Sequence, residues 1–215
     1  MNAKVKICGM REVDNVKAIG QLSPDFMGFI LYPPSPRFVL EEALSELLPL
    51  LSDNTSAVAV FVNETAEEMI RICAEYGFSY AQLHGGESVE VCQKVKAEGI
   101  GVIKAFPVSD SIDLDLLQTY EPFVDYFLFD TKTKSYGGSG KQFEWNLLST
   151  YSLDTPYFLS GGIGESDIET ILNSSLPGCV GIDANSKLEI EPGLKNIEAS
   201  ADLIKQIRNR RNKRS

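Results

Sequence analysis

The chain has 215 residues, of which 43% are hydrophobic and 23% are charged, and its formal net charge at pH 7 is −10. This length and composition are typical of a globular protein with one sizeable core. The negative charge argues against nucleic acid as a partner, because such binding needs a basic surface. No apolar run reaches the roughly 18 residues of a membrane span. The first ten residues do not form a secretory signal, so we expect a cytoplasmic protein without a membrane partner.

The cysteines predict neither a metal centre nor a disulfide framework. Cys8, Cys73, Cys92 and Cys179 form no CxxC or CxxH pair, so reduced thiols and no metal are the simpler expectation. Three of them fall inside predicted helices or a predicted strand, where a buried thiol is the expected state. Cys8 differs, because it ends the first predicted strand. On this observation alone a structural role and a chemical role both remain open for it.

Eight short runs rich in β-branched and aromatic residues alternate with segments of helical periodicity. The predicted strands are 4–8, 26–32, 56–62, 80–84, 101–106, 125–130, 156–161 and 179–183. The predicted helices include 41–51, 65–77, 88–99, 165–173 and 196–210. Strands that are apolar at nearly every position imply a sheet covered on both faces. A closed (β/α)8 barrel, that is, a TIM barrel, and a large doubly wound sheet both satisfy this alternation, and the strand count favours the barrel.

No Pro- or Ser-rich linker divides the eight units, which predicts a single α/β domain over residues 1–215. The end of this domain is basic. The cations that follow the last predicted helix are Arg208, Arg210, Arg211, Lys213 and Arg214. A solvated, frayed helix end from about residue 208 explains this tail better than RNA binding, because cations are favourable near a helix C-terminus.

Active sites of such barrels lie at the carboxyl ends of the strands, so the residues that follow each run are the candidates. These positions carry many polar residues and glycines. In chain order they are Cys8, Arg37, Asn63, Gln82, His84, Phe106, Asp130, Gly161, Gly162, Asp183, Asn185 and Ser186. His84 is the only histidine, so no second histidine can share a metal with it. It either touches a ligand or orders the rim of the barrel by hydrogen bonds.

Two of these strand ends indicate a phosphate site. The segment SGGIGES follows the seventh strand and opens a predicted helix, and DANS follows the eighth strand. Glycines at a helix start let backbone N–H groups approach an anion, and the helix dipole favours its charge. In barrels, phosphate sites recur in the loops after strands seven and eight. We therefore expect a phosphate near Gly161, Gly162, Asp183, Asn185 and Ser186.

The loop after the sixth strand, DTKTKSYGGSGKQFEW, is rich in glycine and lysine. A loop of this composition either closes over an anionic ligand as a lid or is an ordinary surface loop. The lid residues would be Lys132, Gly137, Gly138, Gly140 and Lys141.

Six segments in order resemble the phosphoribosylanthranilate isomerase family across essentially the whole chain. They are KICGM, YPPSPRF, QLHG, FDTKTKSYGGSGKQFEW, LSGGI and GIDANSKLEIEPGLKN. The resemblance implies a (β/α)8 barrel without a cofactor that takes part in tryptophan biosynthesis. The family converts N-(5′-phosphoribosyl)anthranilate to 1-(2-carboxyphenylamino)-1-deoxy-D-ribulose 5-phosphate by an Amadori rearrangement. It permits a monomer or a homodimer.

Carried over by position, the resemblance makes Cys8 the general base and Asp130 the general acid. Arg37 would face the anthranilate carboxylate, and its loop is stiffened by three prolines. The Gly161–Gly162 turn would hold the phosphate end together with Asp183 and Ser186. The other substrate-binding residues expected at these strand ends are Gln82, His84 and Asn185.

The ordinary acidities of the two side-chain types oppose these roles. The ordinary pKa of an aspartic acid is near 3.9 and that of a thiol is near 8.5. A protonated Asp130 together with an ionised Cys8 therefore costs about 6 kcal/mol relative to the opposite protonation states. A nearby cation would lower the cost of the thiolate. Lys6 and Lys104 can supply that cation if they point inward, which the strand pattern does not resolve.

Two other functions fit a phosphosugar barrel. A Schiff-base aldolase would use Lys104 or Lys132 as its nucleophile. A non-catalytic phosphosugar-binding barrel would need neither the acid nor the base, and the presence of both Cys8 and Asp130 argues against it.

Overall fold

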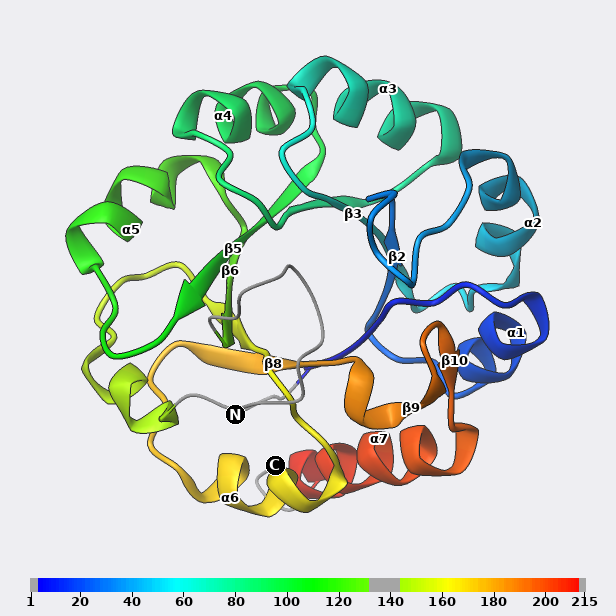
Figure 1. Cartoon of the computed structure of the whole chain (residues 1–215). Coiled ribbons are helices and arrows are strands. Elements are labelled where there is room, and N and C mark those ends of the chain that lie inside the picture. Colours follow the sequence, from blue (N-terminus) through cyan, green and yellow to red (C-terminus); the bar gives the residue numbers. More distant parts are fainter. Residues whose placement is uncertain (1–3, 132–143, 213–215) are drawn as a thin grey trace.

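Eight parallel strands close into a barrel in the computed structural model, which describes residues 4–131 and 144–212 (Figure 1). Each strand pairs with the next along the chain, and β8 pairs with β1, so the sheet has no edge. The strands are β1 (Lys4–Cys8), β2 (Phe26–Ile30), β3 (Ser56–Phe61), β4 (Tyr80–Leu83), β5 (Gly101–Val108), β6 (Tyr126–Thr131), β7 (Tyr157–Leu159) and β8 (Cys179–Ala184). The predicted barrel is confirmed, and the observed strands differ from the predicted ones only at their ends.

Side chains along each strand alternate between the barrel interior and the layer beneath the helices. On β1, Val5 and Ile7 belong to the large outer apolar cluster, whereas Cys8 belongs to the small inner one. Phe26 fills the amino-terminal end of the interior, where it packs edge to face against Tyr80 and Phe158. These aromatic rings therefore form a plug that fills the amino-terminal end of the barrel interior. The carboxyl-terminal end of the interior, above the plug, is left for polar side chains.

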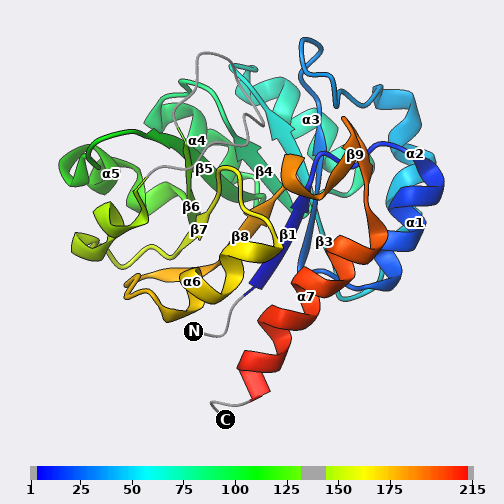
Figure 2. The same ribbon diagram turned by 60° about the horizontal axis from the view of Figure 1, so that its bottom comes forward.

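Helices surround the barrel as an outer ring (Figures 1 and 2). They are α1 (Val13–Gln21), α2 (Leu44–Leu47), α3 (Ala66–Tyr76), α4 (Val89–Ala97), α5 (Leu114–Tyr120), α6 (Ile168–Asn173) and α7 (Ile197–Asn212). Helix α3 has clear boundaries, because the Thr65 hydroxyl accepts a hydrogen bond from the Glu68 N–H and Gly77 takes the left-handed conformation at its end.

Two connections between strands do not contain the regular α-helix that the alternating pattern predicts. The expected helix at 41–51 is broken into a 3-10 turn, the short α2 and a second 3-10 turn that contains Pro49. Proline has no N–H to donate, so it cannot continue the α-helical hydrogen-bond ladder. In the described part of the β6–β7 connection the helical element is a 3-10 helix, Trp145–Thr150. The eight units are therefore unequal in their helices although regular in their strands.

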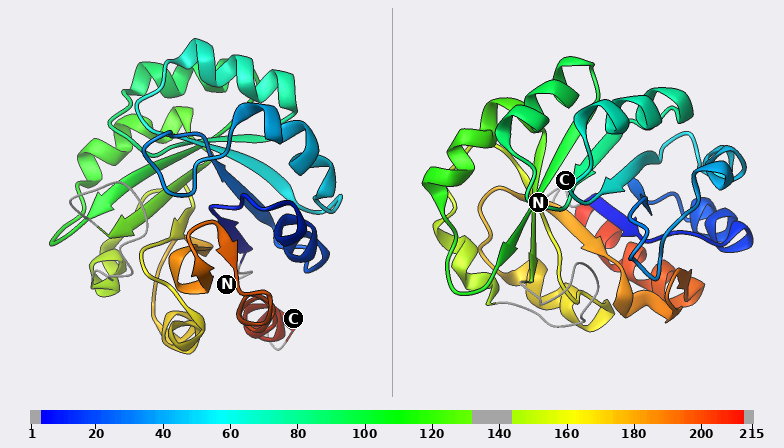
Figure 3. Two further views of the ribbon diagram at one scale, coloured as in Figure 1. Left: turned by 45° about the vertical axis from the view of Figure 1, so that its right-hand side comes forward. Right: turned by 45° about the horizontal axis from the view of Figure 1, so that its top comes forward.

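A small antiparallel hairpin, β9 (Glu189–Glu191) and β10 (Leu194–Lys195), follows β8 and lies between α1 and α7 (Figure 1). The Asn15 side chain ties it to α1 through two hydrogen bonds of 2.8 Å with the backbone of Lys195. Helix α7 then packs against α1, α6 and β1 and completes the ring (Figure 3). Arg208 in α7 donates to the carbonyls of Leu22 and Ser23. No helix in residues 4–131 or 144–212 is long and apolar enough to cross a membrane.

Candidate active site

A pocket opens at the carboxyl ends of the strands, where barrel architecture places an active site. Its lining residues are Cys8, Ile30, Tyr32, Ser35, Val60, Val62, Gln82, His84, Asp130, Thr131, Ser160, Gly161, Gly162, Asp183, Asn185 and Ser186. The structure therefore brings together the strand-end residues that the sequence singles out, apart from three. Arg37, Asn63 and Phe106 do not line this pocket.

Asp130 is the penultimate residue of β6, on one side of the pocket, and it lies next to His84 at the β4 rim. The His84 Nε2 atom lies 3.4 Å from Asp130 Oδ2, and the Gln82 amide nitrogen lies 2.7 Å from His84 Nδ1. The Gln82 amide thus orients the His84 ring so that its Nε2 atom faces Asp130. The other Asp130 oxygen accepts the Thr131 N–H at 2.8 Å. His84 thus orders the rim, as one of its two sequence interpretations proposed, while it also lines the pocket.

The Gly161–Gly162 turn follows β7 and forms another part of the pocket wall. Both residues have positive φ angles, +95° for Gly161 and +64° for Gly162. A Cβ atom on Gly161 would lie 2.2 Å from the Thr131 hydroxyl and 2.8 Å from the Thr131 nitrogen. Only glycine fits this conformation and this close approach. The turn therefore presents backbone rather than side chains to the pocket.

Cys8 ends β1 and has a buried side chain on the same face of the strand as Lys6. The Lys6 ammonium donates to Asp183 Oδ1 at 2.8 Å, and its charge acts on the Cys8 thiol. Burial raises the pKa of the Cys8 thiol and Lys6 opposes that rise, Asp183 adds to it, and Lys195 lowers it slightly. The net result is a pKa above the ordinary value of a thiol. The Ser160 hydroxyl lies 3.4 Å from the second oxygen of Asp183.

The two lysines left open by the strand pattern point in opposite directions. Lys6 faces the barrel interior beneath Cys8, whereas Lys104 on β5 points outward to Glu87 at 3.0 Å. The Lys104 ammonium also donates to the carbonyls of Leu83, Gly85 and Ala105. Glu87 in turn accepts the N–H groups of Asn63 and Gly85, so this ion pair holds the loops after β3 and β4. Lys104 does not face the pocket and is wrongly placed for a Schiff-base nucleophile.

We expect Lys104→Met to destabilise the fold by about 3–5 kcal/mol, because it leaves the buried Glu87 carboxylate without its cation. Both side chains of this pair are at most 2% exposed. Urea unfolding of the variant measures the loss as a lower midpoint. The matched control is Lys94→Met, whose partner Glu67 lies at the surface, and its midpoint should stay near that of the unmodified chain. Equal midpoints for all three proteins would contradict the stabilising role of the Lys104–Glu87 pair.

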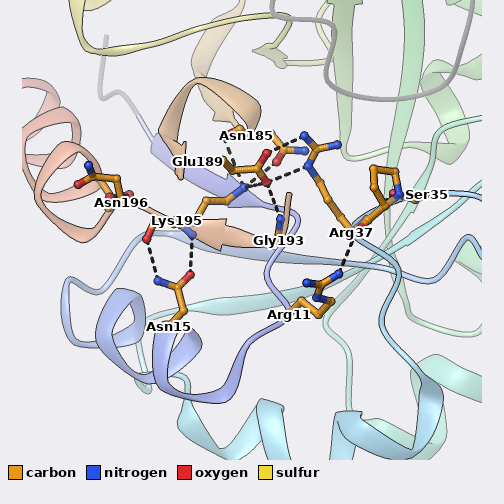
Figure 4. A network of polar contacts seen from close by, with 11 residues as sticks. Arg11, Asn15, Ser35, Arg37, Asn185, Glu189, Gly193, Lys195 and Asn196 are labelled. Carbon is orange, nitrogen blue, oxygen red and sulfur yellow. Dashed lines mark hydrogen bonds and ion pairs between the residues drawn. The ribbon is translucent and has the colours of Figure 1, made fainter. Parts of the chain in front are cut away.

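Arg37 lies beside the pocket in a buried ionic network with the β9–β10 hairpin (Figure 4). Its guanidinium binds Glu189 in bidentate fashion, at 2.8 Å through Nε and 2.6 Å through Nη2. Lys195 donates to the same carboxylate at 2.7 Å and to the Asn185 side chain at 2.6 Å. Gly9 makes room for the network, since a Cβ atom there would lie 2.7 Å from Arg37 Cδ. The network links Arg37 to the pocket through Asn185.

Glu189 and Lys195 were not singled out from the sequence. They stand in the segment LEIEPGLK after the eighth strand, where opposite charges flank a Pro-Gly turn. That pattern predicts a hairpin, but it does not say that its charges fold back onto Arg37.

The remaining cysteines are buried, as predicted. Burial raises the pKa of Cys73 to about 12, of Cys92 to about 11 and of Cys179 to about 12. None of these three thiols lines the pocket, whereas Cys8 does. The lid residues expected after β6 lie outside the described residues, namely Lys132, Gly137, Gly138, Gly140 and Lys141.

A closed (β/α)8 barrel with a thiol, a carboxyl group and a glycine turn around one rim pocket has the architecture of a barrel enzyme. Residues 5–206 match the family model described as N-(5′-phosphoribosyl)anthranilate (PRA) isomerase. The chain belongs to this family, whose members are isomerases.

Individual relatives agree with the family model. The chain is 45% identical over 205 residues to the N-(5′-phosphoribosyl)anthranilate isomerase of Parabacteroides distasonis, covering 94% of this chain and 92% of the relative. It is 33% identical to the crystal structure of phosphoribosyl anthranilate isomerase from Thermotoga maritima, with a TM-score of 0.86 and 96% and 99% of the two chains covered. A third relative, a phosphoribosyl anthranilate isomerase in complex with reduced 1-(O-carboxyphenylamino)-1-deoxyribulose 5-phosphate, has a TM-score of 0.82 at 29% identity, covering 96% and 99%.

Proposed function

We propose that this chain converts N-(5′-phosphoribosyl)anthranilate to 1-(2-carboxyphenylamino)-1-deoxy-D-ribulose 5-phosphate, with Asp130 as general acid and Cys8 as general base. The observation that carries the proposal is that Cys8 on β1 and Asp130 on β6 line one pocket together with the Gly161–Gly162 turn. Family membership supports the substrate, and so does the related structure that was solved with a reduced carboxyphenylamino deoxyribulose phosphate.

The rearrangement needs one proton delivered and one removed. Asp130 gives its proton to the ring oxygen of the ribose, the bond between C1 and that oxygen breaks, and the nitrogen lone pair forms the C=N bond of a protonated imine (an iminium ion). Cys8 then takes the proton from C2, and the electrons of that C–H bond form the enolamine. Tautomerisation of the enolamine to the ketone completes the isomerisation without a net oxidant or reductant. Strands on different sides of the barrel supply the two groups, so a sugar can lie between them.

Substrate binding uses the rest of the pocket. The backbone of the Gly161–Gly162 turn and the residues Asn185 and Ser186 surround the phosphate. Asp183 is an anion paired with Lys6 and would repel a phosphate, so it is better suited to accept a hydrogen bond from a sugar hydroxyl. An apolar wall of Ile30, Val60 and Val62 suits the anthranilate ring.

Arg37 is assigned to the anthranilate carboxylate. Because its guanidinium is already engaged by Glu189, it must share or exchange that partner when the carboxylate binds. A planar guanidinium has five N–H donors, of which the bidentate contact with Glu189 uses two, so sharing is chemically feasible.

The test is turnover of N-(5′-phosphoribosyl)anthranilate by the purified chain, followed by the loss of substrate fluorescence and by identification of the ketose product. We expect turnover without an added metal or cofactor. Binding of the substrate without any product would favour the phosphosugar-binding barrel instead. Trapping of a phosphosugar on a lysine by borohydride, with no isomerase activity, would favour the aldolase.

A further inference from the structure

Strand register places a buried charge pair directly beneath Cys8. Residues Lys6 and Asp183 are paired neighbours in the parallel ladder of β1 and β8. Cys8 stands two residues after Lys6 on the same strand, so both side chains point into the barrel. The Lys6 side chain has no exposed surface and Asp183 is 5% exposed. This pair therefore lies inside the barrel, between the aromatic plug below and the pocket above.

The neighbouring strand leaves room for the thiol and the ammonium to meet. Gly28 on β2 is the ladder partner of Cys8. A Cβ atom on Gly28 would lie 2.8 Å from the Cys8 sulfur and 3.2 Å from the Lys6 nitrogen. Any larger residue would push these two atoms apart or out of the interior. Glycine at this position therefore leaves the space that the Lys6 nitrogen and the Cys8 sulfur both border.

The Lys6 ammonium carries a permanent charge at physiological pH. Burial lowers its pKa, but the nearby Asp183 and Cys8 outweigh this effect, and the pKa of Lys6 is raised overall. Three ionisable groups act on Cys8, namely Lys6 on its own strand, Asp183 on β8 and Lys195 on β10, while β2 contributes the glycine. Lys195 is paired with Glu189 and has the smallest effect of the three.

A buried ion pair is a costly way to stabilise a barrel, because desolvation offsets much of its attraction. The Lys104–Glu87 pair holds two loops in return for that cost, through hydrogen bonds with the backbone of Asn63 and Gly85. The Lys6–Asp183 pair instead lies beneath the thiol and beside the Ser160 hydroxyl. Its position therefore points to a role in the site rather than in loop anchoring.

We propose that Lys6, held in place by Asp183, is a positioning residue that stabilises the Cys8 thiolate and so makes Cys8 a usable base. The inference rests on the proposed function only for the use of the thiolate as a base. The ionisation of Cys8 itself can be measured without substrate, so the two proposals can fail separately.

The test titrates Cys8 by the ultraviolet absorbance of its thiolate, taken as the difference between each protein and its Cys8→Ser counterpart. The Lys6→Met variant should move the Cys8 midpoint upward by about one pH unit or more. The Asp183→Asn variant should move it downward, because it removes an anion and leaves the cation. A purely structural role for the pair would move both midpoints in one direction or neither of them.

The control for the loss of a buried lysine is Lys104→Met, which should leave the Cys8 midpoint unchanged while it lowers stability. If Lys6→Met does not fold, the double variant Lys6→Met/Asp183→Asn removes both charges and should still raise the midpoint, because Lys6 acts on Cys8 more strongly than Asp183 does. An unmoved or lowered midpoint in the folded Lys6-substituted protein, or a shift as large in Lys104→Met, overturns the inference.

Discussion

Asparagine in place of Asp130 lowers kcat by about 10²- to 10⁴-fold, the usual contribution of a general acid. The amide has nearly the shape of the carboxyl group and can keep its place beside His84, so KM should change little. It cannot transfer a proton to the ring oxygen, so the loss appears in kcat. Steady-state kinetics with the fluorescent substrate measures both constants.

The matched control is Asp125→Asn, at the residue that immediately precedes the same strand. Asp125 accepts the Val102 N–H at 2.8 Å and binds Lys96, and it does not line the pocket. This variant should keep the kcat of the unmodified chain even where it loses some stability. A normal rate for Asp130→Asn, or an equal loss in both variants, would remove Asp130 from the role of acid.

Serine in place of Cys8 removes the proposed base and should lower kcat by a similar factor of about 10²–10⁴. A serine hydroxyl has almost the same size but ionises far less readily than a thiol, so the pocket keeps its shape and loses its proton acceptor. Cys73→Ser is the control, because it makes the same change at a buried helix thiol outside the pocket. Retention of full activity by Cys8→Ser would show that another group is the base.

The pH profile of kcat/KM tests whether one acid and one base act together in the rate-determining form of the enzyme. In the proposed mechanism the active form holds Asp130 protonated and Cys8 ionised, so between the two ionisations each gain in thiolate is matched by a loss of acid and the rate is flat. Above the pKa of Cys8 no more thiolate forms while the acid is still lost, and the rate falls. Since the pKa of Cys8 is raised, the fall should begin above about pH 8.5. A rate that climbs steadily through pH 8 would contradict the assignment.

The architecture was largely predictable because it rests on local patterns. Apolar runs such as 4–8 and 56–62 with helices between them require a sheet covered on both faces, and eight of them favour closure. The closed barrel then brings all strand ends to one rim. Cys8, Asp130 and Gly161 could therefore be predicted as neighbours although they are far apart in the chain. Helix shape was less predictable, because Pro49 interrupts an otherwise helical pattern.

By itself, the sequence determined which residues reach the rim of the barrel: these positions follow from strand order and from the ends of the apolar runs. Only the tertiary structure decided how those residues pair. Strands that are apolar on both faces do not reveal which face a lysine takes, so Lys6 and Lys104 look alike in sequence, yet one lies under the thiol and the other anchors two loops. The contact of Arg37 with Glu189 likewise joins residues 152 positions apart, which no local pattern encodes. The chemical environment of Cys8 arises from packing between strands, and this packing shifts the pKa of its thiol.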